Sequence, residues 1–202
     1  HKRDKILSET MFVFIPLAHR LGLYGIKSEM EDIWLRYKEP EAFNEITEKI
    51  NRNISDKDRE ISDFIAPIND ALKAAGFKYE IKKRVKTPYS IWNKMNNKGI
   101  PFDQIYDLYA VRIIFDPDKD SKETERDQCY HVFSIITSIY HYKSDRMRDW
   151  VNAPKSNGYE ALHSTVMGPD GIWVEVQVRT ERMDDIAERG FAAHWKYKHA
   201  SI

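Results

Sequence analysis

The chain has 202 residues, enough for one or two domains with a substantial core, and its 42% apolar content excludes a disordered protein. Its 32 basic and 32 acidic residues cancel, so net charge argues neither for nor against a nucleic-acid partner. A single cysteine, Cys129, excludes a disulfide framework or a cysteine metal site and favours a reducing, intracellular setting. The sequence has no apolar run of about 18 residues, so no membrane span is expected.

Residues 4–75 have the pattern of helices. A broad apolar stripe from Leu7 to Ala18 predicts a first helix, with a kink at Pro16. A glycine-containing turn is expected at 21–26, followed by helices over 28–37 and from Pro40 to about Ala75, where Gly76 ends the last one. The chain opens without a signal-peptide pattern, and we expect it to be an excerpt of a longer protein, cut inside a helix.

From Phe77 onward the pattern becomes that of a sheet with helices. Alternation predicts a strand from Phe77 to Ile81, and Thr87-Pro88 is typical of a helix start. The elements expected after this helix are a strand at 107–115, a helix at 125–141, a hairpin of strands at 161–168 and 172–179, and a helix from Thr180 to about Lys198. The order predicts an α/β or α+β domain with a mixed sheet at 76–202, preceded by a helical segment at 1–75.

Basic residues gather between Ile81 and Phe102, where there are six of them and no acid. Arg84 and Lys86 would lie on one strand face if the strand extends that far, and Ser90 and Lys94 on one helix face. Because the N-terminus of a helix also attracts anions, this arrangement could hold several phosphates. A solvated basic surface would have the same composition, so both interpretations stay open.

Two carboxylates belong to predicted strands. Asp107 begins an apolar strand and could simply be a turn residue. In the strand at 172–179, Glu175, Gln177 and Arg179 alternate with valines and face the opposite side. An acid such as Glu175 has low strand propensity and is costly if buried alone, so a functional role and a rim salt bridge are equal alternatives for it. Two such carboxylates near a phosphate-binding surface would suit Mg²⁺, which takes one or two carboxylates plus substrate phosphates.

Three further residues have both structural and ligand-binding interpretations. Arg112, inside an apolar strand, could pair with Asp107 or Glu175, or stack on a base. Tyr159 follows an Asn-Gly turn and could be a core residue or an exposed stacking residue. His163 has the pattern of a structural histidine. Since the sequence has neither a P-loop nor a GxGxxG motif, side chains and metal would have to hold any phosphates.

Together these segments resemble the synthetase domain of the RelA/SpoT family, the (p)ppGpp synthetases of the bacterial stringent response. The segments that carry the resemblance are RVKTPYSIWNKM (84–95), FDQIYDLYAVRIIF (102–115), RMRDWVNAPKSNGYEALHSTV (146–166), VEVQVRT (174–180) and AERGFAAHWKYK (187–198). Residues 9–37 are similar to the final helices of the family's hydrolase domain. The His-Asp pair of that domain's metal site is absent from the sequence, so we expect no alarmone hydrolysis.

The resemblance implies Mg²⁺-dependent transfer of pyrophosphate from ATP to the 3′-hydroxyl of GTP or GDP, in an α+β fold similar to nucleotidyltransferases of the polymerase-β type. It assigns Asp107 to the metal, and Glu175 to activation of the 3′-hydroxyl and to the metal. Its ATP-binding set is Arg84, Lys86, Ser90, Lys94 and Arg112, with Arg84 and Arg112 on the two sides of adenine. Its acceptor-binding set is Tyr159, stacked on guanine, with Lys155, Asn157, His163, Gln177 and Arg148.

The family's basic R-x-K-D motif reads Arg146-Met147-Arg148-Asp149 here, a class that by analogy leans towards GDP. The resemblance also implies a cytoplasmic enzyme that lacks here its hydrolase and C-terminal regulatory domains and meets the ribosome only through the parent protein. Two alternatives remain: a non-catalytic nucleotide- or RNA-binding module, and a synthetase held inactive in this fragment. Residues 1–75 are expected to be a packing and coupling element.

Overall fold

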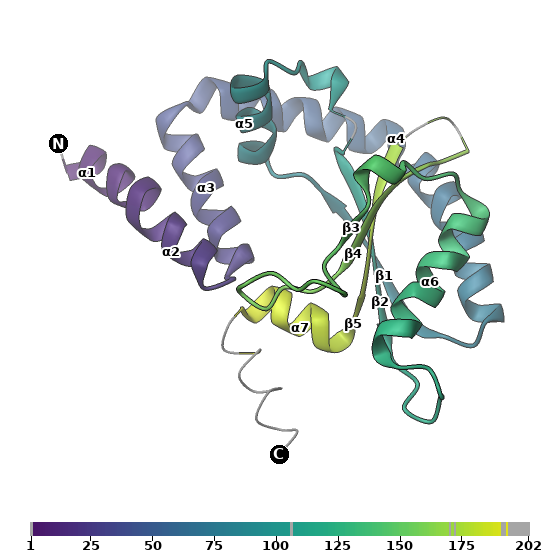
Figure 1. The fold of residues 1–202 in the computed structure, drawn as a ribbon. Helices are drawn as coiled ribbons and strands as arrows, with labels where there is room; N and C mark the ends of the chain where they lie inside the picture. The colour runs from purple at the N-terminus through teal and green to yellow at the C-terminus, as the bar shows by residue number, and fades with distance from the viewer. Residues whose placement is uncertain (1, 106, 170, 172, 191–192, 194–202) are drawn as a thin grey trace.

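A five-stranded mixed sheet forms the centre of the fold (Figure 1). The computed structural model describes residues 2–105, 107–169, 171, 173–190 and 193. The strands lie in the order β1 (Lys78–Val85), β2 (Tyr109–Asp116), β5 (Trp173–Thr180), β4 (Leu162–Met167) and β3 (Arg148–Asp149). Only the β2–β5 pair is parallel; the other three pairs are antiparallel. The expected α+β class with a mixed sheet is therefore confirmed. The two-residue strand β3 was not predicted, since two residues show no alternation.

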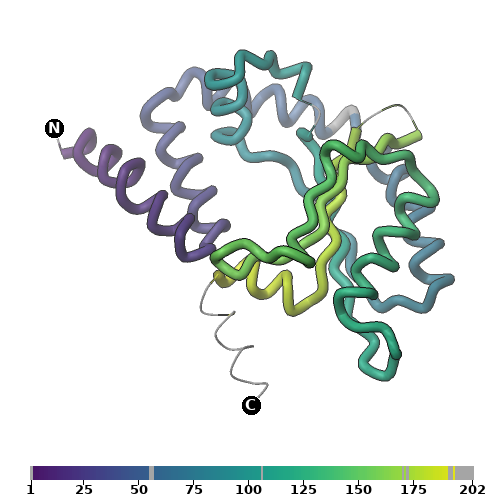
Figure 2. Tube along the Cα trace, in the orientation of Figure 1, coloured from purple at the N-terminus to yellow at the C-terminus, as the bar shows by residue number. Residues whose placement is uncertain are grey.

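The N-terminal helices form a layer beside the polar side of the sheet (Figures 1 and 2). They are α1 (Lys2–Glu9), a π-helical turn (Thr10–Phe14), α2 (Ile15–Arg20) and α3 (Tyr24–Lys38). The interruption expected at Pro16 is present as the π-helical turn directly before α2, because proline has no N–H to continue the regular ladder. The turn to α3 is shorter than predicted, and α3 begins at Tyr24 instead of residue 28.

The long helix α4 (Pro40–Ala74) belongs to the core of the sheet domain. Its apolar stripe includes Ile61, Phe64, Ile68 and Leu72, which join one hydrophobic cluster with the inner face of the sheet. Helices α5 (Pro88–Lys98) and α6 (Glu125–Ile139) contribute to the same cluster, and short 3-10 helices occupy Phe102–Gln104 and Ser144–Arg146. The division between 1–75 and 76–202 stays a prediction, but the packing shows that α4 and the sheet share their core.

Phe64 tests how much α4 stabilises this core. Its side chain is 1% exposed and stacks on Tyr140 with ring centroids 4.6 Å apart, and the Tyr140 hydroxyl donates to its carbonyl. We expect Phe64→Ala to lower the free energy of unfolding by about 3–5 kcal/mol, measured by urea denaturation. The matched control is Phe12→Ala on a 77% exposed ring, which should change it by less than about 0.5 kcal/mol. Equal effects would contradict a shared core.

Helix caps confirm most of the predicted boundaries in the second half. Thr87 caps α5 through the N–H of Ser90, and Thr180 caps α7 (Glu181–Arg189) through the N–H of Met183. The helix α7 ends at Arg189, and Gly190 is its C-cap with φ +68°; the predicted extension of this helix to about Lys198 lies mostly outside the described residues. Residues 191–192 and 194–202 lie outside the described residues. Across the described residues, no helix combines the length and apolarity that a bilayer span would need.

Candidate active site

The two faces of the sheet differ in polarity, and the polar face carries the candidate site. On β2 and β5, Val111, Ile113, Val174, Val176 and Val178 are buried in the core. The second half of α4 and helix α6 lie on this apolar side, whereas α7 and α3 lie on the other (Figure 1). The predicted alternation of β5, with Glu175, Gln177 and Arg179 facing away from the valines, therefore decides which side chains reach the site.

The strand register lines up polar side chains in a row across all five strands. Lys82 on β1 pairs with Arg112 on β2, Arg112 with Gln177 on β5, Gln177 with His163 on β4, and His163 with Arg148 on β3. Paired residues point to the same face, so these five side chains share one band of the sheet. Four of them were predicted site residues. Arg148 stands at the exposed end of the row, where it donates to the carbonyls of Asp145 and Met147.

The next row contains both Arg84 and Glu175. Arg84 pairs with Ala110 on β2, and Ala110 pairs with Glu175 on β5. Alanine has a short side chain, so the basic residue and the carboxylate flank a small residue. β1 extends to Val85, which confirms that Arg84 lies within a strand, and the Lys86 N–H continues the ladder to the Leu108 carbonyl at 2.9 Å.

A cavity of about 470 Å³ opens on this polar face. Its lining includes seven of the predicted residues: Arg84, Ser90, Arg112, Lys155, Tyr159, His163 and Gln177. Seven basic side chains line the cavity, counting Lys27, Lys82, Lys83 and Arg179 as well, against the two acids Glu31 and Glu188. A polyanion of nucleotide size is the ligand that such a lining would attract.

Part of the cavity wall comes from the helical segment, which the sequence did not predict. Tyr24, Lys27, Ser28 and Glu31 of α3 all line it. The approach depends on Gly190, where an added Cβ would lie 2.4 Å from the carbonyl oxygen of Leu21 in the α2–α3 turn. Only a residue without a side chain lets this turn come so close to the end of α7.

Asp107 forms a compact cluster with two of the predicted phosphate ligands. The Lys86 ammonium lies 2.9 Å from its Oδ2, and the Lys94 ammonium lies 2.6 Å from Oδ1 and 2.5 Å from Oδ2. Asp107 lies in a turn two residues before β2, so the prediction that it begins the strand was wrong, because β2 begins at Tyr109. Lys86, Lys94 and Asp107 are therefore brought together.

The charges in this cluster affect one another. Burial acts to raise the pKa of the Asp107 carboxyl, but the charges and hydrogen bonds of Lys86 and Lys94 together hold that pKa below its usual range. Burial lowers the pKa of the Lys94 ammonium in spite of its carboxylate partner. In this cluster a metal cation could bind the Asp107 carboxylate, and phosphate oxygens could bind the ammonium groups of Lys86 and Lys94.

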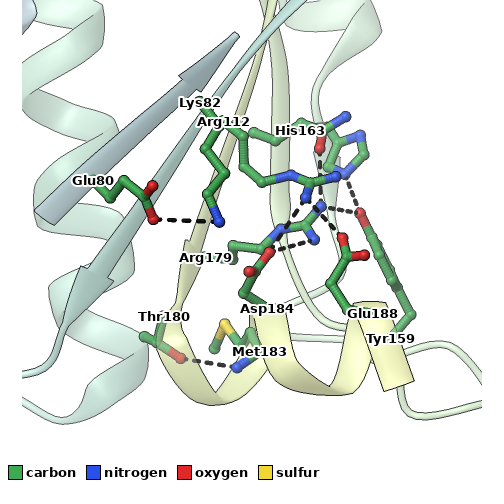
Figure 3. A network of polar contacts seen from close by, with 11 residues as sticks. Glu80, Lys82, Arg112, Tyr159, His163, Arg179, Thr180, Met183, Asp184 and Glu188 are labelled. Atoms are coloured by element: carbon green, nitrogen blue, oxygen red, sulfur yellow. Dashed lines mark hydrogen bonds and ion pairs between the residues drawn. The ribbon is translucent and has the colours of Figure 1, made fainter. Parts of the chain in front are cut away.

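Arg112 pairs with α7 rather than with either predicted carboxylate (Figure 3). Its Nη1 lies 2.9 Å from Glu188 Oε1 and 3.4 Å from Asp184 Oδ1. Of the two alternatives for Arg112, the ion pair with Asp107 or Glu175 is not formed, because α7 covers this band of the sheet and supplies the carboxylates of Asp184 and Glu188. Its predicted stacking on a base stays a prediction.

Tyr159 is buried, which contradicts the exposed position considered for it. It is 8% exposed, and the rings of Tyr24, Trp150 and His163 contact it edge-on at centroid distances of 5.7, 5.9 and 5.9 Å. The Lys155 ammonium lies 4.9 Å from its ring centroid. The other acceptor-side residues surround it: Asn157 donates to the Tyr24 hydroxyl at 2.6 Å, and Lys155 lies 4.2 Å from the Trp150 ring. Neighbouring aromatics therefore cover the ring that would stack on guanine.

Glu175 lies next to His163, which belongs to this aromatic group. Glu175 Oε1 accepts from Gln177 Nε2 at 2.7 Å and lies 3.6 Å from His163 Nδ1. Burial, with the charges of Arg179 and Lys155, lowers the pKa of His163 to about 3, so the imidazole is neutral at neutral pH. Arg179 donates to Gln177 on the same strand. It also bonds to Tyr159 and Asp184, as Figure 3 shows.

The donor set suits a hard cation better than a transition metal. Among the described residues no group of three or more His, Cys, Asp or Glu side chains gathers to hold a metal. The parallel register of β2 and β5 places Asp107 and Glu175 towards the same end of the sheet. Two carboxylates beside a basic cavity fit Mg²⁺, which completes its coordination with phosphate oxygens and water.

The fold and the site together define an α+β domain with a mixed sheet and a basic cavity on its polar face. The family described as "Region found in RelA / SpoT proteins" matches residues 83–202, and the chain belongs to this family. The resemblance seen in the sequence is therefore confirmed.

Relatives and one solved structure extend this comparison. The chain is 36% identical over 199 residues to the GTP pyrophosphokinase of Photobacterium angustum and 38% identical over 197 residues to the bifunctional (p)ppGpp synthase/hydrolase SpoT of Escherichia coli. Each alignment covers 98% of this chain, but the chain spans only about a quarter of those relatives, 26% and 27%. The crystal structure of small alarmone synthetase 1 from Bacillus subtilis aligns with a TM-score of 0.52 at 19% identity, covering 77% of this chain and 82% of that one, which confirms the expected fold.

Proposed function

We propose that this chain carries the (p)ppGpp synthetase activity of a longer RelA/SpoT protein. The reaction is the Mg²⁺-dependent transfer of pyrophosphate from ATP to the 3′-hydroxyl of GTP or GDP, with release of AMP. The cytoplasmic setting, the role in the stringent response, the hydrolase and regulatory domains of the parent chain and its contact with the ribosome are parts of the same proposal.

The cavity on the polar face of the sheet is the observation that carries this proposal. Seven basic side chains line it. Glu175 lies outside the lining but accepts a hydrogen bond from Gln177, which lines it. The Lys86–Asp107–Lys94 cluster also lies outside the lining, and Lys94 belongs to the same helix as the lining residue Ser90. Phosphoryl-group transfer depends mainly on positioned substrates and neutralised phosphate charge, and these residue types supply both.

Each group has a role that follows from its chemistry. Glu175 accepts the proton of the acceptor's 3′-hydroxyl. The hydroxyl oxygen attacks the β-phosphorus of ATP, and the bond between that phosphorus and the oxygen that leaves with AMP breaks. Arg84, Lys86, Ser90 and Lys94 bind the ATP phosphates, and Arg112 adenine. Tyr159, Lys155, Asn157, His163, Gln177 and Arg148 form the acceptor side. Mg²⁺, held by Asp107 and Glu175, would neutralise the charge of the phosphate oxygens.

A non-catalytic nucleotide- or RNA-binding module is the alternative. The same basic and aromatic surface would serve it, but Asp107 and Glu175 would weaken phosphate binding by charge repulsion. A synthetase held inactive in this fragment is favoured by one observation, the contact of Tyr24 with both Tyr159 and Asn157 on the acceptor side.

Incubation of the chain with labelled ATP, Mg²⁺ and either GTP or GDP, followed by anion-exchange chromatography, tests the proposal. We expect pppGpp or ppGpp to form together with one AMP per product, and the two acceptors to show which is preferred. Binding of both nucleotides without product would overturn activity of this fragment and support the inactive alternative. Binding of RNA without product would support the module.

Lys94 provides a test of the metal site that does not depend on turnover. Because Lys86 and Lys94 neutralise Asp107, we expect Mn²⁺, used as a paramagnetic probe, to bind the protein weakly until ATP draws the lysines away. Lys94→Ala should tighten Mn²⁺ binding in the absence of ATP by roughly tenfold, as one cation next to the carboxylate is removed. The measurement is electron paramagnetic resonance of free Mn²⁺. Lys98→Ala, an exposed lysine of the same helix, is the control and should change nothing.

A further inference from the structure

Arg179 is a buried cation whose surroundings include the candidate active site. It is 1% exposed and lies on β5 on the same face as Glu175 and Gln177. Its Nη1 lies 3.2 Å from Asp184 Oδ1, while Nη2 donates to Gln177 Oε1 at 2.9 Å and to Tyr159 Oη at 3.0 Å. Burying a guanidinium costs free energy, and Asp184 Oδ1, the carboxylate oxygen that Arg179 contacts, is shared with Arg112. Two of its bonds thus go to neutral side chains of the site, which stability alone does not explain.

The bond to Gln177 fixes the orientation of that side-chain amide. A guanidinium can only donate, so the atom of Gln177 that faces Arg179 must be the oxygen. The amide nitrogen is then turned the other way and donates to Glu175 Oε1 at 2.7 Å. Arg179 therefore decides that Gln177 presents a donor, not an acceptor, to the Glu175 carboxylate.

The bond to Tyr159 fixes the tautomer of His163. Among the described residues, the Tyr159 hydroxyl has two hydrogen-bond partners, Arg179 Nη2 and His163 Nε2 at 2.7 Å. Because Arg179 donates, the hydroxyl satisfies its own proton only by donating to Nε2. A ring nitrogen that accepts a hydrogen bond carries no proton, so the ring proton is on Nδ1, which faces Glu175 Oε1 at 3.6 Å. This separation is longer than a hydrogen bond, but it places an N–H dipole towards the carboxylate.

We propose that Arg179 is a positioning residue that aims two donors at Glu175, one through Gln177 and one through Tyr159 and His163. Both paths run over the polar face of β5 and β4, and Figure 3 shows the Arg179, Tyr159 and His163 part of them. The hydrogen bond from Gln177 and the N–H dipole of His163 favour one orientation of the carboxylate. The catalytic part of this inference rests on the proposed role of Glu175; the hydrogen-bond order does not.

The His163 tautomer is the direct test, because it requires no substrate. Nitrogen-15 NMR of the protein labelled at histidine, at neutral pH, should show His163 protonated on Nδ1, with its signal identified by its loss in His163→Gln. Tyr159→Phe removes only the hydroxyl and should shift the population towards the Nε2-protonated form. A His163 protonated on Nε2 in the unsubstituted protein, or no change in Tyr159→Phe, would overturn the inference.

Kinetics test the positioning role. Arg179→Met should lower kcat by about ten- to a hundredfold with the KM for ATP nearly unchanged, and Arg179→Lys should recover part of the loss. The matched control is Arg182→Met, a half-buried arginine of α7 that pairs with Glu125 and Glu160 outside the cavity lining and should lose stability but keep kcat. If Arg179→Met does not fold, Tyr159→Phe takes its place, with a smaller loss of kcat expected.

The two measurements separate the inference from the function on which it builds. A protein that makes no alarmone but shows the Nδ1 tautomer, lost in Tyr159→Phe, would overturn the proposed function and keep the Arg179-ordered network. An active protein in which Arg179→Met loses no more kcat than Arg182→Met would overturn the positioning role and keep the function.

Discussion

Replacing Glu175 with glutamine is expected to lower the rate of pyrophosphate transfer by about 10²- to 10⁴-fold, the range that a positioned general base supplies. The substitution keeps the size of the side chain and one acceptor oxygen, so Gln177 Nε2 can still donate to position 175. What is lost is the negative charge and the ability to take the proton of the 3′-hydroxyl. Nucleotide binding should survive, because the basic side chains of the cavity are untouched.

The measurement is single-turnover formation of the labelled product, beside equilibrium binding of ATP and of the acceptor. Glu80→Gln is the matched control, since Glu80 is also borne by a strand but is exposed and pairs with Lys82. It should leave the rate within about twofold. A Glu175→Gln protein that retains most of its transfer rate would remove Glu175 as the base.

Local patterns predicted the elements well where the chemistry of one segment decided the structure. Thr87 and Pro88 begin α5 as expected, because a cap and a first-turn proline each act within one turn. The alternation of β5 correctly separated the valines from Glu175, Gln177 and Arg179. The short strand β3 was missed, because its pairing with β4 is a property of the folded sheet.

The candidate site was predicted as a set of residues but not as a geometry. Arg112, Gln177, His163 and Arg148 lie in one row only because the strand register aligns them, and register between distant segments cannot be read from a single sequence. For the same reason the partners of Arg112 on α7 were missed. The burial of Tyr159 depends on Tyr24, which is 135 residues earlier in the chain and approaches through the Gly22 and Gly190 turns.

Tyr159→Ala is expected to weaken binding of GTP or GDP by about ten- to a hundredfold, the loss that follows when an aromatic platform for one base is removed. ATP affinity should change by less than about threefold, because the ATP side of the site, Arg84 and the Lys86–Asp107–Lys94 cluster, does not contact this ring. Isothermal titration with each nucleotide separately makes the comparison. Equal losses for both nucleotides, or none for the acceptor, would contradict the stacking role.

The burial of Tyr159 adds a structural effect that must be separated from stacking. Removing a ring that contacts Tyr24, Trp150 and His163 should lower the free energy of unfolding by about 3 kcal/mol, so titrations belong well below the unfolding temperature. Tyr159→Phe keeps the ring and should keep acceptor affinity, even though it breaks the bonds to Arg179 and His163.

Tyr24→Ala tests whether Tyr24 only covers the Tyr159 ring or itself binds the guanine nucleotide. Tyr24 contacts Tyr159 edge-on and accepts from Asn157, so it occupies space against two predicted acceptor ligands. If guanine stacks on Tyr159, removal of Tyr24 should leave acceptor affinity unchanged or increase it, since a competitor for the ring is gone. A loss as large as that of Tyr159→Ala would instead make Tyr24 part of the acceptor site, and α3 a binding element rather than a cover.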